Sequence, residues 1–142
     1  MSRALRDSVR LQMSSRSAAA RVLALAVVVE AALRVTEFPK LVRRLGISLV
    51  SRPAGQPLPS APSLKELVAT VDRILRRWPE DGRCLRRALV LGLLLRRHSP
   101  VIRIGVVRER GVVRAHAWLE VDNRPIGEPS DPTLQFSPLS AP

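Results

Sequence analysis

Residues 63–78 carry the clearest pattern of apolar and polar positions in the chain. Apolar side chains recur there at intervals of three and four residues, which places them on one face of a helix. They are Leu64, Leu67, Val68, Val71, Ile74, Leu75 and Trp78. Ser63 and Glu66 have the spacing of a capping box, and Pro79 follows the last apolar position. The pattern predicts an amphipathic helix that begins at Ser63.

A second helix is predicted from about Gly82 to Arg97, with Asp81 as its N-cap. Its central stretch, ALVLGLLL, is apolar on nearly all sides. A helix that is apolar all round is typically buried. We therefore expect this helix to lie at the centre of the molecule.

Two further helices are predicted upstream, at residues 15–35 and 37–46. The shorter one has Pro39 in its first turn and Gly46 just past its end, which is the usual asymmetry of helix ends. Residues 1–14 are basic and polar, and we expect them to be mobile.

After His98 the pattern changes to strands. Residues 101–108 and 112–121 are rich in β-branched side chains, and residues 109–111 predict the turn between them. Residues 122–124 predict a second turn, PIGE a short third strand, and the proline-rich tail an extended surface segment. Helices followed by an antiparallel β-meander indicate an α+β fold.

Prolines divide the chain. The stretch SRPAGQPLPSAPS is a stiff, extended connector that follows the first two predicted helices. We therefore expect a helical N-terminal region at residues 1–51, the connector at 52–62 and the main core at 63–142.

The charge of the chain is strongly positive. It has 24 basic residues against 12 acidic ones, for a net charge of +12. A basic surface attracts acidic partners such as nucleic acid. However, aromatic residues make up only 3% of the chain, Tyr is absent, and no nucleic-acid recognition motif is present. A basic nucleic-acid-binding module is therefore an alternative function and not the leading one.

The apolar run Val22–Val29 is only eight residues long, between Arg21 and Glu30. A spanning helix needs roughly 20 apolar residues, so we expect a buried or partner-facing helix, with peripheral membrane contact as a weaker alternative. A single cysteine can form neither an intrachain disulfide nor a multi-cysteine zinc site. Cytoplasm is the default location, and we expect no metal and no cofactor.

The single cysteine, Cys84, would lie in the first turn of the predicted central helix. The helix dipole and the free backbone N–H groups favour an anion there, and Arg83, Arg86 and Arg87 add positive charge. A nucleophilic thiolate needs a general base. His98 is roughly 20 Å away along the same helix, at about 1.5 Å per residue, which leaves His116. The alternative is that Cys84 is a small apolar filler and His116 a half-exposed strand residue.

His116 lies in the middle of the second predicted strand. On a period of two it shares one face with Arg114, Trp118 and Glu120, while the other face is uniformly apolar. A strand packed through the apolar face turns His116 toward the opposite face, which the start of the Cys84 helix can still cover.

The motifs RCLRRALVLGLLLRR, IRIGVVR and AHAWLEVDNRPIGE, in this order, resemble those of the lasso-peptide maturation proteases. These are bacterial members of the transglutaminase-like, papain-like cysteine peptidases, and the resemblance covers roughly residues 60–142. It implies a transglutaminase-like protease fold, with Cys84 as the nucleophile and His116 as the general base and then acid. The backbone N–H of Cys84 would contribute to the oxyanion site, and Trp118 could form a wall of it.

The family's third catalytic member is an Asp twelve residues past the His, and here that position is Glu128. Asp131 is the next candidate and Asp122 lies nearer in sequence. A three-residue loop at 122–124 would pair Val121 with Pro125 and place Glu128 on the face of His116, whereas a two-residue loop would place it on the wrong face. We therefore predict Glu128.

The resemblance also implies partners. The region before residue 60 is too short and too helical to be the leader-recognition domain that some members carry, so the chain resembles the split form of the family. It would cleave a precursor peptide delivered by a separate leader-recognition protein, and a cyclase would then close the macrolactam. Acyl transfer to an amine through the same thioester is the neighbouring enzymatic alternative.

Overall fold

The structure is a computed structural model that describes residues 3–139, with side chains placed in residues 15–139. Helices occupy the first two thirds of the described chain: α1 (Arg3–Val35), α2 (Phe38–Arg44), α3 (Ala61–Leu75) and α4 (Arg83–Leu94), followed by the 3-10 turn η1 (Arg96–His98). The strands follow: β1 (Val101–Glu109), β2 (Val112–Val121), β3 (Arg124–Pro125) and, after the 3-10 turn η2 (Pro132–Leu134), β4 (Ser137–Pro138).

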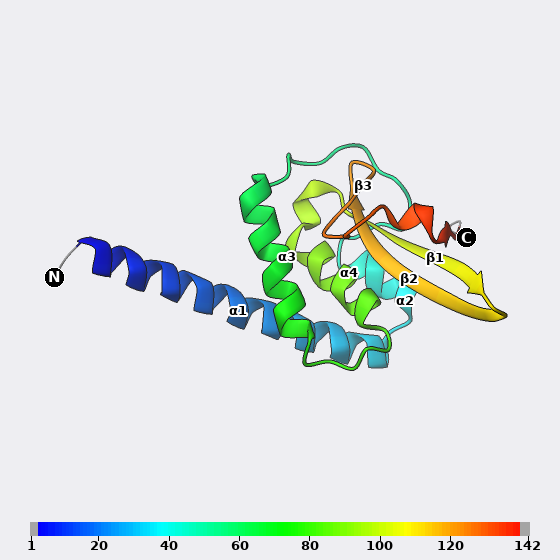
Figure 1. The fold of residues 1–142 in the computed structure, drawn as a ribbon, viewed down its shortest axis with the longest axis horizontal. Helices are drawn as coiled ribbons and strands as arrows, with labels where there is room; N and C mark the ends of the chain where they lie inside the picture. The colour runs from blue at the N-terminus through cyan, green and yellow to red at the C-terminus, as the bar shows by residue number, and fades with distance from the viewer. Residues whose placement is uncertain (1–2, 140–142) are drawn as a thin grey trace.

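The first helix is longer than predicted. It begins at Arg3 and not at residue 15, so residues 3–14 continue the helix that was predicted to start later. Neither Gly nor Pro occurs between residues 3 and 35, and most residues there are good helix formers, so nothing interrupts the helix. Figure 1 shows the N-terminal half of α1 projecting away from the rest of the molecule.

The predicted start of one helix and the predicted cap of another are also wrong in detail. Helix α3 begins at Ala61 after Ser60, with Pro62 in its first turn, and no side chain caps it. Helix α4 follows Gly82, which has a φ of 72°, and Asp81 does not cap it. Proline is well tolerated in a first turn because its missing N–H would have no partner there, which explains the earlier start of α3.

The helices form one hydrophobic core with the sheet. Helix α1 packs against α3 and α4, and its buried side chains Val22, Ala26 and Val29 share a cluster with Leu89 of α4. The residues of α4 between Ala88 and Gly92 are fully buried, as their apolar sequence predicts. Described side chains from before and after the proline-rich connector therefore share one core, and the connector joins two parts of it.

Helix α4 lies against strand β2 in the centre of the molecule (Figure 1). A Cβ atom added at Gly92 would lie 2.6 Å from Cδ1 of Ile47 and 3.3 Å from Cδ1 of Leu119. The absence of a side chain at Gly92 thus allows the close approach of helix and strand.

The sheet has the strand order β3-β2-β1-β4, and the pairs within it are antiparallel. Both hairpin turns contain two residues and not the predicted three. Arg110 and Gly111 join β1 to β2, and Asp122 and Asn123 join β2 to β3. All four residues have a positive φ, which is the conformation of the type I′ turn that suits the twist of a hairpin.

The proline-rich tail contributes to the sheet. Strand β4 pairs with β1 on the edge opposite β3, with Pro138 opposite Gly105. Proline is compatible with an edge strand because one side of such a strand needs no hydrogen-bond donor. Helices followed by an antiparallel sheet confirm the predicted α+β fold class.

Candidate active site

Cys84 is the second residue of α4. Its side chain is partly buried and in no disulfide. Gly82 turns the chain into the helix with a φ of 72°, a left-handed conformation that favours glycine. The first turn of a helix leaves backbone N–H groups without helical partners. The N–H of Arg83 is bonded to the carbonyl of Glu80, so the N–H groups that can stabilise a thiolate, or an oxyanion formed beside it, are those of Cys84 and Leu85.

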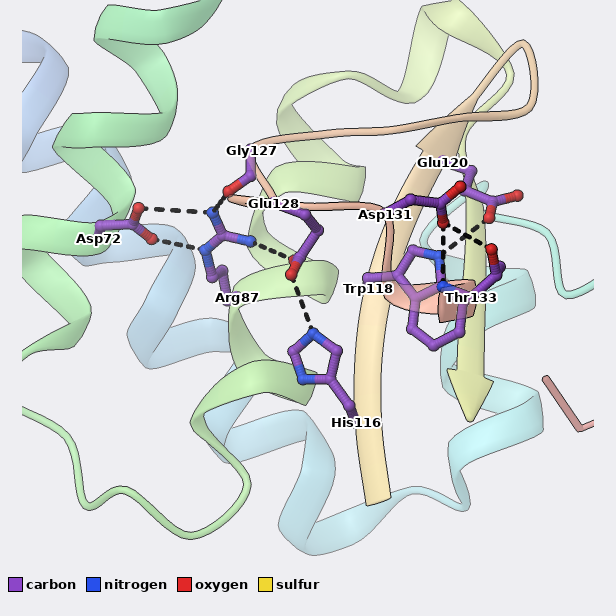
Figure 2. Close-up of polar contacts among 9 residues, drawn as sticks. All are labelled: Asp72, Arg87, His116, Trp118, Glu120, Gly127, Glu128, Asp131 and Thr133. Carbon is purple, nitrogen blue, oxygen red and sulfur yellow. Dashed lines mark hydrogen bonds and ion pairs between the residues drawn. The ribbon is translucent and has the colours of Figure 1, made fainter. Parts of the chain in front are cut away.

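His116 lies in the middle of β2 and contacts Glu128. The distance between Nε2 of His116 and Oε2 of Glu128 is 3.0 Å (Figure 2). The Glu128 side chain is only 9% exposed, and that of His116 is 26% exposed. This contact uses one ring nitrogen and leaves Nδ1 as the atom that can exchange a proton with a thiol.

The other two candidate acids lie elsewhere. Asp131 accepts hydrogen bonds from the backbone N–H and the hydroxyl of Thr133, at 2.9 and 2.7 Å. The side-chain bond from Thr133, and then its backbone bond, hold the pKa of Asp131 below its ordinary value. Asp122 is exposed in the turn between β2 and β3. The structure thus brings Glu128 to His116 and neither Asp122 nor Asp131.

The turn before Glu128 nevertheless differs from the predicted one. The turn at 122–123 is the two-residue form that was expected to place Glu128 on the wrong face. The strand register does not extend that far, because β3 ends at Pro125. Gly127 then bends the chain with a φ of 69°, and a Cβ atom there would lie 2.6 Å from Val68 and 2.7 Å from Nη2 of Arg87. The loop, and not the pleat of the sheet, turns Glu128 toward His116.

Arg87, one turn along α4 from Cys84, contacts the acid from its other side. Nη1 of Arg87 donates to Oε1 of Glu128 at 2.9 Å, and Nη2 donates to the carbonyl of Gly127 at 2.6 Å. Nε and Nη2 of Arg87 also bind Asp72 of α3. Figure 2 shows the four groups in a row, from Asp72 through Arg87 and Glu128 to His116. The sequence had pointed to Arg87 only as a source of positive charge.

Arg87 connects the helix that carries Cys84 to the His116–Glu128 pair. Residues three apart in a helix lie on the same face, so the side chains of Cys84 and Arg87 leave α4 in similar directions. Arg87 contacts Glu128, and Glu128 contacts His116. No hydrogen bond joins the thiol of Cys84 to His116 in the described part of the chain. Such contacts are often long in an enzyme without substrate and tighten when substrate binds.

Two aromatic side chains cover the ring of His116. Trp118 stacks on it with the ring centroids 5.9 Å apart, and Phe136 lies at 5.2 Å. Trp118 is fully buried, and its Nε1 donates to Glu120 at 2.9 Å. These rings exclude water from one side of the imidazole. Trp118 had been expected as a wall of the site, whereas Phe136, from the proline-rich tail, carried no signal in the sequence.

In the described part of the chain, side chains of the types that bind metals do not form a metal site. Within residues 3–139, no set of three or more His, Cys, Asp or Glu side chains is arranged to hold a metal ion. His98 lies apart from the site, with Nδ1 2.9 Å from the carbonyl of Gln56. In the same part of the chain, no helix has the length and apolar character needed to span a membrane.

Comparison with known proteins identifies the family. Residues 25–141 match the family model described as the transglutaminase-like superfamily, a range that includes Cys84, His116 and Glu128. No curated protein and no solved structure was found to match the chain. Because the matched range covers most of the chain, this protein belongs to the transglutaminase-like superfamily, whose members include cysteine peptidases and acyltransferases.

Proposed function

We propose that this protein is a cysteine endopeptidase that removes the leader from a ribosomally made lasso-peptide precursor. The observation that carries the proposal is the contact between His116 and Glu128, with Cys84 in the first turn of the helix whose Arg87 binds Glu128. A thiol, an imidazole and an orienting carboxylate are the parts that nucleophilic acyl chemistry requires.

The reaction proceeds in two steps at these residues. The thiolate of Cys84 attacks the carbonyl carbon of the scissile peptide bond, and backbone N–H groups at the start of α4 stabilise the oxyanion. The C–N bond then breaks, His116 gives its proton to the departing amine, and a thioester of the leader remains on Cys84. His116 next takes a proton from water, the hydroxide attacks the thioester, and the leader leaves as a carboxylic acid. Glu128 keeps the imidazole oriented and stabilises its protonated form.

The choice of a leader peptidase rests on the sequence motifs. The stretches RCLRRALVLGLLLRR, IRIGVVR and AHAWLEVDNRPIGE form α4, β1, β2 and the loop that carries Glu128. The same stretches carry the resemblance to the lasso-peptide proteases, so the resemblance covers the site itself. We further propose that a separate leader-recognition protein delivers the precursor, that a lasso cyclase uses the product, and that the reaction takes place in the cytoplasm.

The direct test is cleavage of a precursor peptide in the presence of the recognition protein, followed by mass spectrometry. We expect one cut at the end of the leader with the wild-type protein and none with Cys84→Ala. Cys84 is a small, partly buried residue, so the variant should keep its fold, which circular dichroism checks. Full cleavage by a folded Cys84→Ala protein would overturn the proposal.

A second arm separates hydrolysis from acyl transfer. The same reaction is run with a small primary amine in excess, because a thioester intermediate can pass its acyl group to water or to an amine. A leader that ends in a free carboxylate supports the peptidase. A leader whose C-terminus is mainly an amide of the added amine would indicate an acyltransferase with the same three residues.

A further inference from the structure

Arg87 makes more polar contacts than the sequence would suggest for one arginine in a basic chain. Its guanidinium binds Asp72 with Nε at 2.6 Å and Nη2 at 3.4 Å, Glu128 with Nη1 at 2.9 Å, and the carbonyl of Gly127 with Nη2 at 2.6 Å. Its side chain is 17% exposed. The guanidinium thus joins α3, α4 and the loop after β3 at one point.

We propose that Arg87 is a positioning residue that acts through Glu128. The inference rests on the proposed catalytic role of Cys84 and His116. Glu128 lies on a loop, beyond the last paired residue of β3 and two residues after Ile126, whose N–H donates to the carbonyl of Leu119 at 2.8 Å. Within the described residues, no hydrogen bond of the sheet involves the backbone of Glu128 itself. Arg87 fixes both the carbonyl of Gly127 and Oε1 of Glu128. Only Oε2 is then left for Nε2 of His116.

The geometry of the contacts requires arginine and not lysine. A guanidinium is planar and directs its N–H groups along fixed lines, so it can hold two carboxylates and a carbonyl at once. A lysine ammonium at this position would keep the charge but could not reproduce these directions. The charges also balance in one particular state: with His116 protonated, two cations alternate with two carboxylates from Asp72 to His116. This is the state that pairs with a Cys84 thiolate.

The test is a double-mutant cycle between Arg87 and Glu128, read as precursor cleavage. We expect Arg87→Met to lower kcat about 10- to 100-fold, because a displacement of about 1 Å at a catalytic group can cost that much, and to leave KM nearly unchanged. Arg87→Lys should restore little of the loss. In a Glu128→Gln background, Arg87→Met should cost almost nothing further, because residues that act as one unit are not additive.

Arg86→Met is the matched control. Arg86 is the neighbouring residue in α4, is 24% exposed and pairs with Glu30 of α1 and not with Glu128. Its substitution removes a comparable ion pair and one positive charge near the start of α4, where Nη1 also binds the carbonyl of Gly82, but it leaves Glu128 untouched. We expect a smaller loss of kcat than Arg87→Met causes, and the same loss whether residue 128 is Glu or Gln. Thermal unfolding curves check that each variant is folded under the conditions in which its kcat is measured. If Arg87→Met fails to fold, Arg87→Lys and Arg87→Lys/Glu128→Gln form the same cycle.

A second readout does not depend on the substrate. The rate at which iodoacetamide alkylates Cys84 reports the thiolate that His116 supports. We expect Arg87→Met to slow alkylation when Glu128 is present and not when it is Gln. If this holds while the wild type cuts no precursor, the positioning role stands and the proposed function falls. If the losses caused by Arg87→Met and Glu128→Gln were multiplicative in the double variant, in both cleavage and alkylation, the positioning role would be overturned.

Discussion

At the scale of the residue, the carboxylate of Glu128 is held by two partners at once. One of its carboxylate oxygens meets Arg87 and the other meets His116, and its side chain is almost fully buried. A buried carboxylate with both oxygens engaged is held in one orientation. The orientation of the His116 imidazole therefore depends, through Glu128 and Arg87, on the position of helix α4.

We expect Glu128→Gln to reduce turnover by about three to four orders of magnitude, as the loss of a carboxylate does in other triads. The Gln side chain can still accept a hydrogen bond from Arg87, but its amide carries no charge to stabilise protonated His116. Initial rates of precursor cleavage measure the effect.

Asp131→Asn is the matched control for this change. Asp131 binds Thr133 at the start of η2 and not His116, so the substitution should affect turnover by less than a few-fold. A large loss in Asp131→Asn, together with a mild one in Glu128→Gln, would transfer the third catalytic role to Asp131.

Gly105 lies opposite His116 in the sheet, and the packing of the aromatic rings depends on it. A Cβ atom there would lie 2.8 Å from Cβ of Phe136 and 2.9 Å from Cζ3 of Trp118. We expect Gly105→Ala to displace both rings, to destabilise the protein by about 1–3 kcal/mol and to lower kcat. Urea unfolding and cleavage rates measure the two effects.

Gly111→Ala separates loss of stability from damage to the site. Gly111 has a φ of 81° in the hairpin turn, and nothing lies within 4 Å of an added Cβ. The substitution strains the turn but leaves the surroundings of His116 intact. Equal losses of kcat in the two folded variants would contradict the role given to Gly105.

The sequence pointed to only some residues of the candidate site. Cys84, His116 and Glu128 were predicted because each occupies a motif position at a fixed distance along the chain. Arg87 and Phe136 were missed because their partners are distant in sequence. Arg87 is 41 residues from Glu128, and the contact depends on a loop bent at Gly127. Only the folded backbone brings such pairs together.

At the scale of the element, the sequence predicted the helices, the long strands and the places of the turns, but not the lengths of the turns. The apolar face of α3 and the buried centre of α4 follow from side-chain spacing alone. The pairs Arg110–Gly111 and Asp122–Asn123 adopt positive φ values, which Gly, Asn and Asp tolerate best. That composition was the available signal for two-residue turns. Strand β4 contains only Ser137 and Pro138, too short for a periodic pattern.

The contact between α1 and α4 should make the protein sensitive to acid. Arg86 forms an ion pair with Glu30, and its hydrogen bond, followed by its charge, lowers the pKa of Glu30 from the usual 4.5 although burial opposes the shift. A carboxyl whose pKa is lower in the folded state contributes stability above its unfolded pKa. That stability is lost as the pH falls through the folded value.

We therefore expect the wild type to lose more stability than Glu30→Gln when the pH is lowered from 7 through 4.5 to below the folded pKa. Urea unfolding at several pH values measures the difference. Glu37→Gln is the control, because Glu37 forms only an exposed pair with Lys40, and such pairs contribute little. If the free energy of unfolding responded equally to pH in the wild type and in Glu30→Gln, the Glu30–Arg86 pair would not stabilise the fold.

At the scale of the whole molecule, α1 extends well beyond the core that its second half helps to form (Figure 1). Its outer face exposes apolar side chains, among them Val27 and Val28, which are 53% and 56% exposed. The helix also carries several arginines. We take this surface as the first one to test for contact with the proposed leader-recognition protein.

We expect the protein alone to cleave its precursor slowly and the recognition protein to accelerate the reaction strongly. Tethering a substrate through a short connection raises its local concentration to about the millimolar range. If the contact is electrostatic, added salt should lower the stimulated rate more than the basal one. Time courses with and without the recognition protein, at low and high salt, measure both. Equal rates would mean that the chain binds the leader without help.

The row of charges from Asp72 to His116 has a consequence for how such chains can diverge. Three of its members belong to α3, α4 and the loop after β3, yet each restricts what the others can be. A shorter acid at position 128 would leave a gap that neither the helix nor the strand could close alone. We therefore expect substitutions at positions 72, 87 and 128 to be tolerated together and not singly. The length of the acid that fits at position 128 depends on where the guanidinium of Arg87 lies.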